Sequence, residues 1–164
     1  MPEKHLGSRA IFWIAAVLCT AADQFTKWLI YERALGGAGE ISVIPGFFSL
    51  RAATNPGIAW GLFASMPFLV TVAGFLAALI VVMYYYWFAG PFRAEGLAWG
   101  SILGGAAGNL IDRVAFGHAR DFLDFQLAGW SWPTFNAADA FITLAAIYIV
   151  VHYLFIEDEH QTHQ

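Results

Sequence analysis

Apolar residues form four long blocks along this chain, and more polar segments separate them. The blocks cover residues 10–29, 68–88, 96–116 and 137–155. A helix of about twenty apolar residues spans the hydrocarbon core of a bilayer, and backbone groups inside lipid must be hydrogen-bonded within the protein. The pattern therefore predicts an all-α membrane protein in which four transmembrane helices form one domain of residues 1–164.

Two of the connecting segments are long loops, at residues 30–66 and 117–136. The first loop alternates glycine and proline with β-prone runs at residues 41–44 and 47–50. The second loop carries aromatic residues such as Trp130 and Trp132, which suit a membrane interface. Because four spans bring both termini to one side of the membrane, both loops lie on the opposite side.

The composition agrees with a membrane protein and excludes several other classes. Apolar residues make up 59% of the chain and charged residues 12%, whereas soluble domains are about 25% charged. A formal net charge of −4 offers no basic surface for nucleic acid. The single cysteine, Cys19, excludes an internal disulfide and a cysteine-built metal site. Lysine and arginine are balanced between the two sides, so the charge distribution does not orient the chain.

Charged side chains interrupt the apolar blocks, although each costs about 2.5–3.5 kcal/mol to insert. Asp23 and Lys27 lie in the first block, Asp112 and Arg113 near the end of the third, and Asp139 near the start of the fourth. Following the chain back and forth across the bilayer, all five lie near the side of the two long loops. This convergence predicts a functional site at one edge of the membrane.

Several of these polar residues also have an ordinary structural explanation. Asp23 and Lys27 are four residues apart with the acid first, which favours a salt bridge within one helix. Asn136 precedes the fourth block, where asparagine commonly caps a helix. Arg113 shares a helix face with Asn109, so it is either an inward clamp for an anion or carbonyl or an interfacial anchor.

Asp139 is harder to explain by structure alone, because no basic residue lies three or four positions away. The dipole of the fourth helix favours a carboxylate at this position. A second acid, Asp121, lies in the preceding loop and could form a dyad with it. Two adjacent carboxylates share a proton, which suits hydrolysis of a peptide bond by an activated water. The histidines show no metal-ligand spacing, so we expect neither a metal nor a cofactor.

Five short motifs together resemble the lipoprotein signal peptidase (signal peptidase II) family. They occur in the family's order at residues 23–27, 55–59, 104–113, 121–122 and 135–139. The resemblance implies a bacterial inner-membrane aspartic endopeptidase with cytoplasmic termini. Such an enzyme cleaves the signal peptide of a diacylglyceryl-modified prolipoprotein just before its lipidated cysteine. It also implies an extracytoplasmic β-cradle in the first long loop.

The resemblance assigns roles residue by residue. It implies that the catalytic pair is Asp121 and Asp139. The substrate-positioning residues it implies are Asn55, Asn109, Arg113 and Asn136. The structural polar residues it implies are Asp23, Lys27 and Asp112. The partners we expect are the lipid-modified prolipoprotein substrate and membrane lipids, and we expect a monomer. Asp124 lies beyond the motif and is expected to be dispensable for cleavage.

Three positions depart from the family pattern. Pro56 stands where threonine is common, and Trp60 stands where phenylalanine is usual. Arg120 stands immediately before Asp121, where a small or β-branched apolar residue is usual, and we expect its side chain to point into the headgroup layer. Two alternatives to the peptidase use the same residues differently. A small ion or proton pathway protein would also need intramembrane acids. A membrane assembly factor would use the glycine-rich third block to dock helices, although it gives no reason for two unpaired acids.

Overall fold

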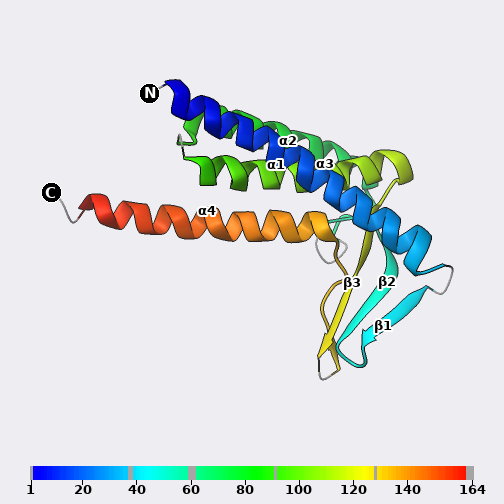
Figure 1. The fold of residues 1–164 in the computed structure, drawn as a ribbon. Coiled ribbons are helices and arrows are strands. Elements are labelled where there is room, and N and C mark those ends of the chain that lie inside the picture. The colour runs from blue at the N-terminus through cyan, green and yellow to red at the C-terminus, as the bar shows by residue number, and fades with distance from the viewer. Residues whose placement is uncertain (1, 37–38, 59–61, 91, 128, 162–164) are drawn as a thin grey trace.

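Four long helices form the body of the protein in the computed structural model, which describes residues 2–36, 39–58, 62–90, 92–127 and 129–161. They are α1 (Pro2–Trp28), α2 (Pro67–Phe88), α3 (Arg93–Phe116) and α4 (Ala137–Gln161). Both termini lie at one end of the helices (Figure 1). The four predicted helices are therefore confirmed, and α1 and α4 extend beyond their predicted bounds at the ends nearest the termini.

The helix α3 is the centre of the bundle and packs against α1, α2 and α4. Glycine makes this possible, because its missing side chain lets backbones approach. A Cβ atom added at Gly104 would lie 2.6 Å from the carbonyl oxygen of Ala16 in α1, and one added at Gly105 would lie 2.5 Å from that of Ala138 in α4. The glycine-rich third block is thus a close-packing face toward two helices at once.

Three stretches among the described residues are long and apolar enough to cross a membrane, at Leu6–Ala34, Pro67–Phe88 and Ala137–Leu154. The predicted third span, α3, does not reach this level because charged residues and glycines lower its hydropathy. Much of α3 is instead buried by its neighbours. Large apolar side chains face outward on the spans, as Phe68 and Trp87 of α2 do, while Asp23 and Lys27 are fully buried.

A four-stranded antiparallel sheet lies at the end of the helices away from the termini (Figure 1). Its strands, in spatial order, are β1 (Glu40–Ile44), β2 (Phe48–Asn55), β3 (Ala119–Leu127) and β4 (Trp130–Ser131). The all-α prediction is therefore wrong, and the fold is mixed. The sheet is also not confined to the first loop, since the second loop supplies β3 and β4. Pairing with β3 satisfies backbone groups of β2 that a two-stranded hairpin would leave exposed.

A short π-helix, η1 (Leu29–Ala34), continues α1 to the sheet. The single proton of its Tyr31 hydroxyl is shared between the carbonyl oxygens of Ala53 in β2, at 2.8 Å, and Asp121 in β3, at 2.7 Å. The same hydroxyl accepts a hydrogen bond from the Ala53 amide at 3.1 Å. Tyr31 thus fastens two strands to the end of α1, where Ala53 and Asp121 are paired in register.

Candidate active site

A buried ion cluster joins α1 to α3. The Lys27 Nζ lies 2.8 Å from Asp23 Oδ2 and 2.9 Å from Asp112 Oδ2, and all three side chains are fully buried. The salt bridge predicted between Asp23 and Lys27 is present, and it extends to Asp112 on the neighbouring helix. Asp23 Oδ1 also accepts a hydrogen bond from the Ala138 amide at 3.0 Å, so the cluster holds the beginning of α4 as well.

Asn109 of α3 connects this cluster to Asp139. Its Oδ1 accepts hydrogen bonds from Lys27 Nζ at 3.2 Å and from Asn136 Nδ2 at 3.0 Å. Its Nδ2 in turn donates to Asp139 Oδ1 at 2.8 Å. Because lysine and the asparagine amide can act only as donors toward Oδ1, the orientation of the Asn109 amide is fixed. Its donating side is therefore aimed at the carboxylate of Asp139.

Asn136 caps α4, as the sequence predicts, and it also contacts both acids. Its side-chain Oδ1 accepts a hydrogen bond from the backbone amide of Asp139 at 3.1 Å, and its backbone amide donates to Asp139 Oδ2 at 3.2 Å. This reciprocal pair is a capping box. The Asn136 Nδ2 also donates to Asp121 Oδ1 at 2.6 Å. One fully buried residue therefore links the carboxylate at the start of α4 to the carboxylate in β3.

Asp121 is 2% exposed and receives hydrogen bonds from the side chains of Asn136 and Asn55. Burial raises the pKa of Asp121 to about 6, and the negative charge of Asp139 contributes in the same direction. The hydrogen bonds from the two asparagines oppose this rise. A carboxyl group with a pKa near 6 can exchange a proton close to neutral pH, as general acid–base catalysis requires.

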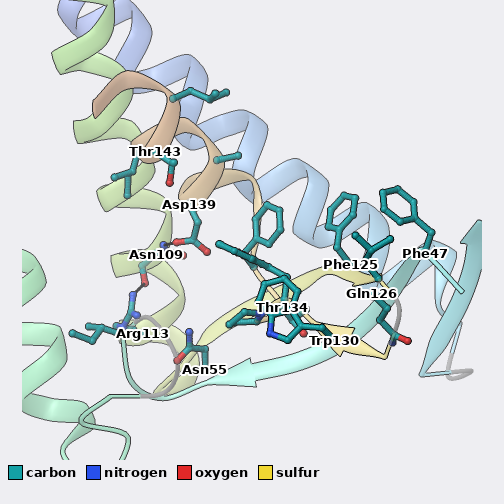
Figure 2. A pocket seen from close by; sticks show the side chains of 18 residues that line it. Phe47, Asn55, Asn109, Arg113, Phe125, Gln126, Trp130, Thr134, Asp139 and Thr143 are labelled. Carbon is teal, nitrogen blue, oxygen red and sulfur yellow. Dashed lines mark hydrogen bonds between the residues drawn. The ribbon is translucent and has the colours of Figure 1, made fainter. Parts of the chain in front are cut away.

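A cavity of about 1000 Å³ opens beside these groups. Asn55, Asn109, Arg113 and Asp139 form its polar corner, while Phe47, Phe125 and Trp130 of the sheet region line another side (Figure 2). Ile142 and Leu144 of α4 extend the apolar lining along the span. Asp121 is buried and is not among the residues that line the cavity, although it is hydrogen-bonded to Asn136. The cavity is therefore apolar, with one carboxylate and three polar partners gathered in one corner.

Comparison with known proteins identifies the family. A profile of the family described as signal peptidase (SPase) II matches residues 15–155. The chain belongs to the signal peptidase II family. It is accordingly an aspartic endopeptidase of the membrane that cleaves the signal peptides of prolipoproteins. This assignment excludes the two alternatives, an ion or proton pathway protein and a membrane assembly factor.

Named relatives and solved structures agree with this signal peptidase II assignment. The lipoprotein signal peptidase of Desulforapulum autotrophicum is 39% identical, covering 87% of this chain and 90% of its own. That of a Janthinobacterium species is 41% identical, covering 89% and 85%. A bacterial membrane enzyme solved at 2.3 Å by the in meso method superposes with a TM-score of 0.75 at 28% identity, over 86% of this chain and 85% of the other.

In this signal peptidase II, Arg113 takes the inward of its two predicted orientations. Its Nη2 donates to the Gly57 carbonyl oxygen at 2.8 Å, just beyond β2, and its Nη1 to the Asn109 carbonyl oxygen at 3.3 Å. The Gly57 amide donates to Asn55 Oδ1 at 3.1 Å, which fixes the same turn. The buried Nε of Arg113 has no hydrogen-bond partner within the described chain. Arg113 itself is one of the residues that line the cavity.

The expected direction of Arg120 is wrong. Its side chain is 15% exposed and pairs with Asp112, with Nη2 2.8 Å from Oδ1, instead of reaching for headgroups. The sequence pattern gives no sign of the roles of Gln24 and Tyr31. Tyr31 contacts the Asp121 carbonyl, and Gln24 contacts Arg120. Gln24 lies inside the first family motif. Its place in the sequence does not signal that its side-chain amide forms hydrogen bonds with Gly108, Asp112 and Arg120.

Asp124 is the second buried acid of β3, and it faces a different network. Its carboxylate accepts from Arg51 Nη2 at 3.1 Å, from Thr134 Oγ1 at 3.2 Å and from Gln126 Nε2 at 2.9 Å. Thr134 and Gln126 line the cavity, so Asp124 supports its wall. Within the described residues, its side chain forms no hydrogen bond or ion pair with Asp121, Asn136 or Asp139. Its burial was not expected from the sequence.

Proposed function

We propose that Asp121 and Asp139 are the catalytic dyad of this signal peptidase II. The observation that carries the proposal is Asn136, which hydrogen-bonds both carboxylates while Asp139 lies in the wall of the cavity. The negative charge of Asp139 also helps to raise the pKa of Asp121, so the two carboxyl groups interact electrostatically. The raised pKa of Asp121 supports the same assignment.

The dyad hydrolyses the peptide bond without a covalent intermediate. The ionised carboxylate removes a proton from water, and the protonated one donates a hydrogen bond to the scissile carbonyl oxygen as the water attacks. Asn55, Asn109 and Asn136 keep the carboxylates oriented, since each donates to one or both of them. Arg113, which lines the polar corner of the cavity, positions a carbonyl of the substrate.

The substrate we propose is a diacylglyceryl-modified prolipoprotein, cleaved just before its lipidated cysteine. The cavity has both a polar and an apolar part, as such a substrate requires. Its polar corner can receive the peptide bond, and its lining along Ile142 and Leu144 follows a span that lies in lipid. The acyl chains can therefore remain in an apolar environment while the cysteine reaches Asp139.

We infer that the sheet end is extracytoplasmic and that the termini are cytoplasmic, with all four helices crossing the membrane. Asp139 lies within the first turn of α4, which at about 1.5 Å per residue is only a few ångströms from the helix end. A lipidated cysteine in the outer leaflet presents its peptide bond at this depth. The same orientation keeps the sheet at the outer surface.

The catalytic assignment is tested with purified protein and a lipidated prolipoprotein. Asp121→Asn and Asp139→Asn should each abolish cleavage while the protein still inserts and folds, because the amide keeps the shape and removes the shared proton. Asp124→Asn is the matched control, since it neutralises another buried acid of the same strand, and it should still cleave. Near-normal turnover in either dyad variant would exclude the assignment.

The orientation is tested by labelling single cysteines with an impermeant reagent on intact spheroplasts. In a Cys19→Ala background, Glu40→Cys in β1 and Ser131→Cys in β4 are exposed positions at the sheet end. Both should react in intact cells, whereas Thr162→Cys near the C-terminus should react only after permeabilisation. The reverse pattern would invert the topology and remove the outer-leaflet substrate with it.

A further inference from the structure

Arg120 is held through its amide, its carbonyl and two of its three guanidinium nitrogens. Its amide donates to Asp112 Oδ2 at 2.9 Å, and its Nε and Nη2 donate to Asp112 Oδ1 at 3.2 and 2.8 Å. Nη2 also donates to Gln24 Oε1 at 3.1 Å, and the Arg120 carbonyl accepts from Asn136 Nδ2 at 3.3 Å. The residue directly before Asp121 is thus attached to α1, α3 and the cap of α4.

The charge of Arg120 completes the buried ion cluster. Asp23 and Asp112 are both fully buried, and Lys27 is the cation that they share. Two carboxylates and one ammonium would leave an uncompensated negative charge, which is costly in a buried site. The Arg120 guanidinium, packed 4.5 Å from the ring centroid of Phe116, supplies the missing positive charge. With it the cluster of four is neutral.

We propose that Arg120 is a positioning residue for Asp121, because it neutralises Asp112 and thereby locks the start of β3 against α1 and α3. The inference rests on the proposed catalytic role of Asp121. It assigns a function to one of the positions at which this chain departs from the family pattern. The alternative is a structural ion pair whose loss lowers stability without a specific effect on the chemical step.

Charge-restoring variants separate these two possibilities. Arg120→Gln leaves the cluster with one excess negative charge and should lower kcat by about tenfold or more, with KM nearly unchanged. Arg120→Lys keeps the charge and should retain most of kcat. In the double variant Arg120→Gln/Asp112→Asn the cluster is again neutral. Its kcat should therefore be about tenfold higher than the value expected if the effects of the two single substitutions multiplied.

Arg51 provides the control for additivity. It pairs with a different buried acid, Asp124 of β3. Among the described residues, its side chain forms no hydrogen bond or ion pair with the α1–α3 cluster. Arg51→Gln combined with Asp112→Asn should therefore give the product of the two single effects. Coupling of the same size in this pair would show that any loss of an ion pair in the sheet has the same result, and would overturn the inference.

The thermal midpoint of unfolding in detergent is measured for the same variants, because it does not depend on which residues catalyse. Coupling of Arg120 with Asp112 in Tm but additivity in kcat would mean a purely structural pair, and would overturn the inference. So would equal losses of kcat in Arg120→Lys and Arg120→Gln. If Arg120→Gln does not fold, Arg120→Lys and the double variant Arg120→Gln/Asp112→Asn must still be folded and active. Loss of activity in either of these two would overturn the inference.

Failure of this inference is distinguishable from failure of the catalytic assignment. If Asp121→Asn is inactive while the Arg120 and Asp112 effects are additive, the dyad stands and only the positioning role is lost. If Asp121→Asn cleaves normally, the dyad assignment itself is wrong, whatever Arg120 does.

Discussion

Replacing Asp121 by asparagine should stabilise the protein at alkaline pH while it abolishes cleavage. The pKa of Asp121 is about 6 in the folded protein, mainly because of burial, against 3.8 in an exposed group. Ionising it in the folded state therefore costs about 3 kcal/mol more than in the unfolded chain, at ~1.4 kcal/mol per pH unit. Asparagine carries no charge, so this cost disappears.

The gain is reduced by one hydrogen bond. An asparagine oxygen still accepts from Asn136, but the new amide group faces the Asn55 donor, at a cost of about 1 kcal/mol. The net stabilisation above pH 7 is then about 2 kcal/mol, or ~4–8 °C in Tm for a chain of this size. This expected gain is large enough to measure from tryptophan fluorescence during heating in detergent.

The gain should vanish as the pH falls. Between about pH 4 and 6 the folded wild-type protein binds more protons at Asp121 than the unfolded chain does, so the wild type gains stability as the pH falls through this window. At about pH 4.5 the remaining gain should only offset the lost hydrogen bond, and the two Tm values should coincide. Asp124→Asn is the control, and it should lower Tm at pH 8 because it breaks the pair with Arg51. An Asp121→Asn Tm that is unchanged at pH 8, or raised equally at both pH values, would refute the burial cost.

Other changes have equally direct outcomes. Asn136→Ser keeps a capping oxygen but loses the donor to Asp121, so kcat should fall by about tenfold or more with little change in Tm. A loss of stability that matches the loss of kcat in free energy would argue against this. Asn136→Ala loses the cap too, and should cost about 1 kcal/mol more in thermal unfolding. Gly105→Ala should destabilise by ~1–3 kcal/mol and impair cleavage, because its Cβ would meet the Ala138 carbonyl and displace α4; wild-type activity would contradict this. Cleavage should continue in excess EDTA, and its loss and recovery with one metal would refute a metal-free dyad.

The helices and the convergence of polar residues could be predicted from the sequence because both depend on local patterns. Hydrophobic blocks report helices, and the parity of the spans shows which polar residues share an edge. Asp23 and Lys27 form a pair one helical turn apart, so their salt bridge is visible in the spacing. The capping duty of Asn136 is visible for the same reason, from its place before an apolar block.

The sheet and the surroundings of Arg120 could not be predicted because they depend on pairing between distant segments. The pairing of β2 with β3 brings Ala53 next to Asp121, although both α2 and α3 separate these two residues along the sequence. An arginine in an aromatic loop is ordinarily directed to headgroups, and only the fold reveals a buried carboxylate at Asp112 within its reach. Asp124 is likewise buried by partners from β2 and from residue 134.

The buried cluster also constrains the order in which the chain is assembled in the membrane. The first helix carries Asp23 and Lys27 together, so it enters the bilayer with its own counter-ion. Asp112 of the third helix has no such provision, because its two cations come from Lys27, far upstream, and from Arg120, which is synthesised later. Asp112 therefore gains both of its ion-pair partners only after the third helix has docked on the first and the following strand has been synthesised, so the buried cluster is completed late in biogenesis.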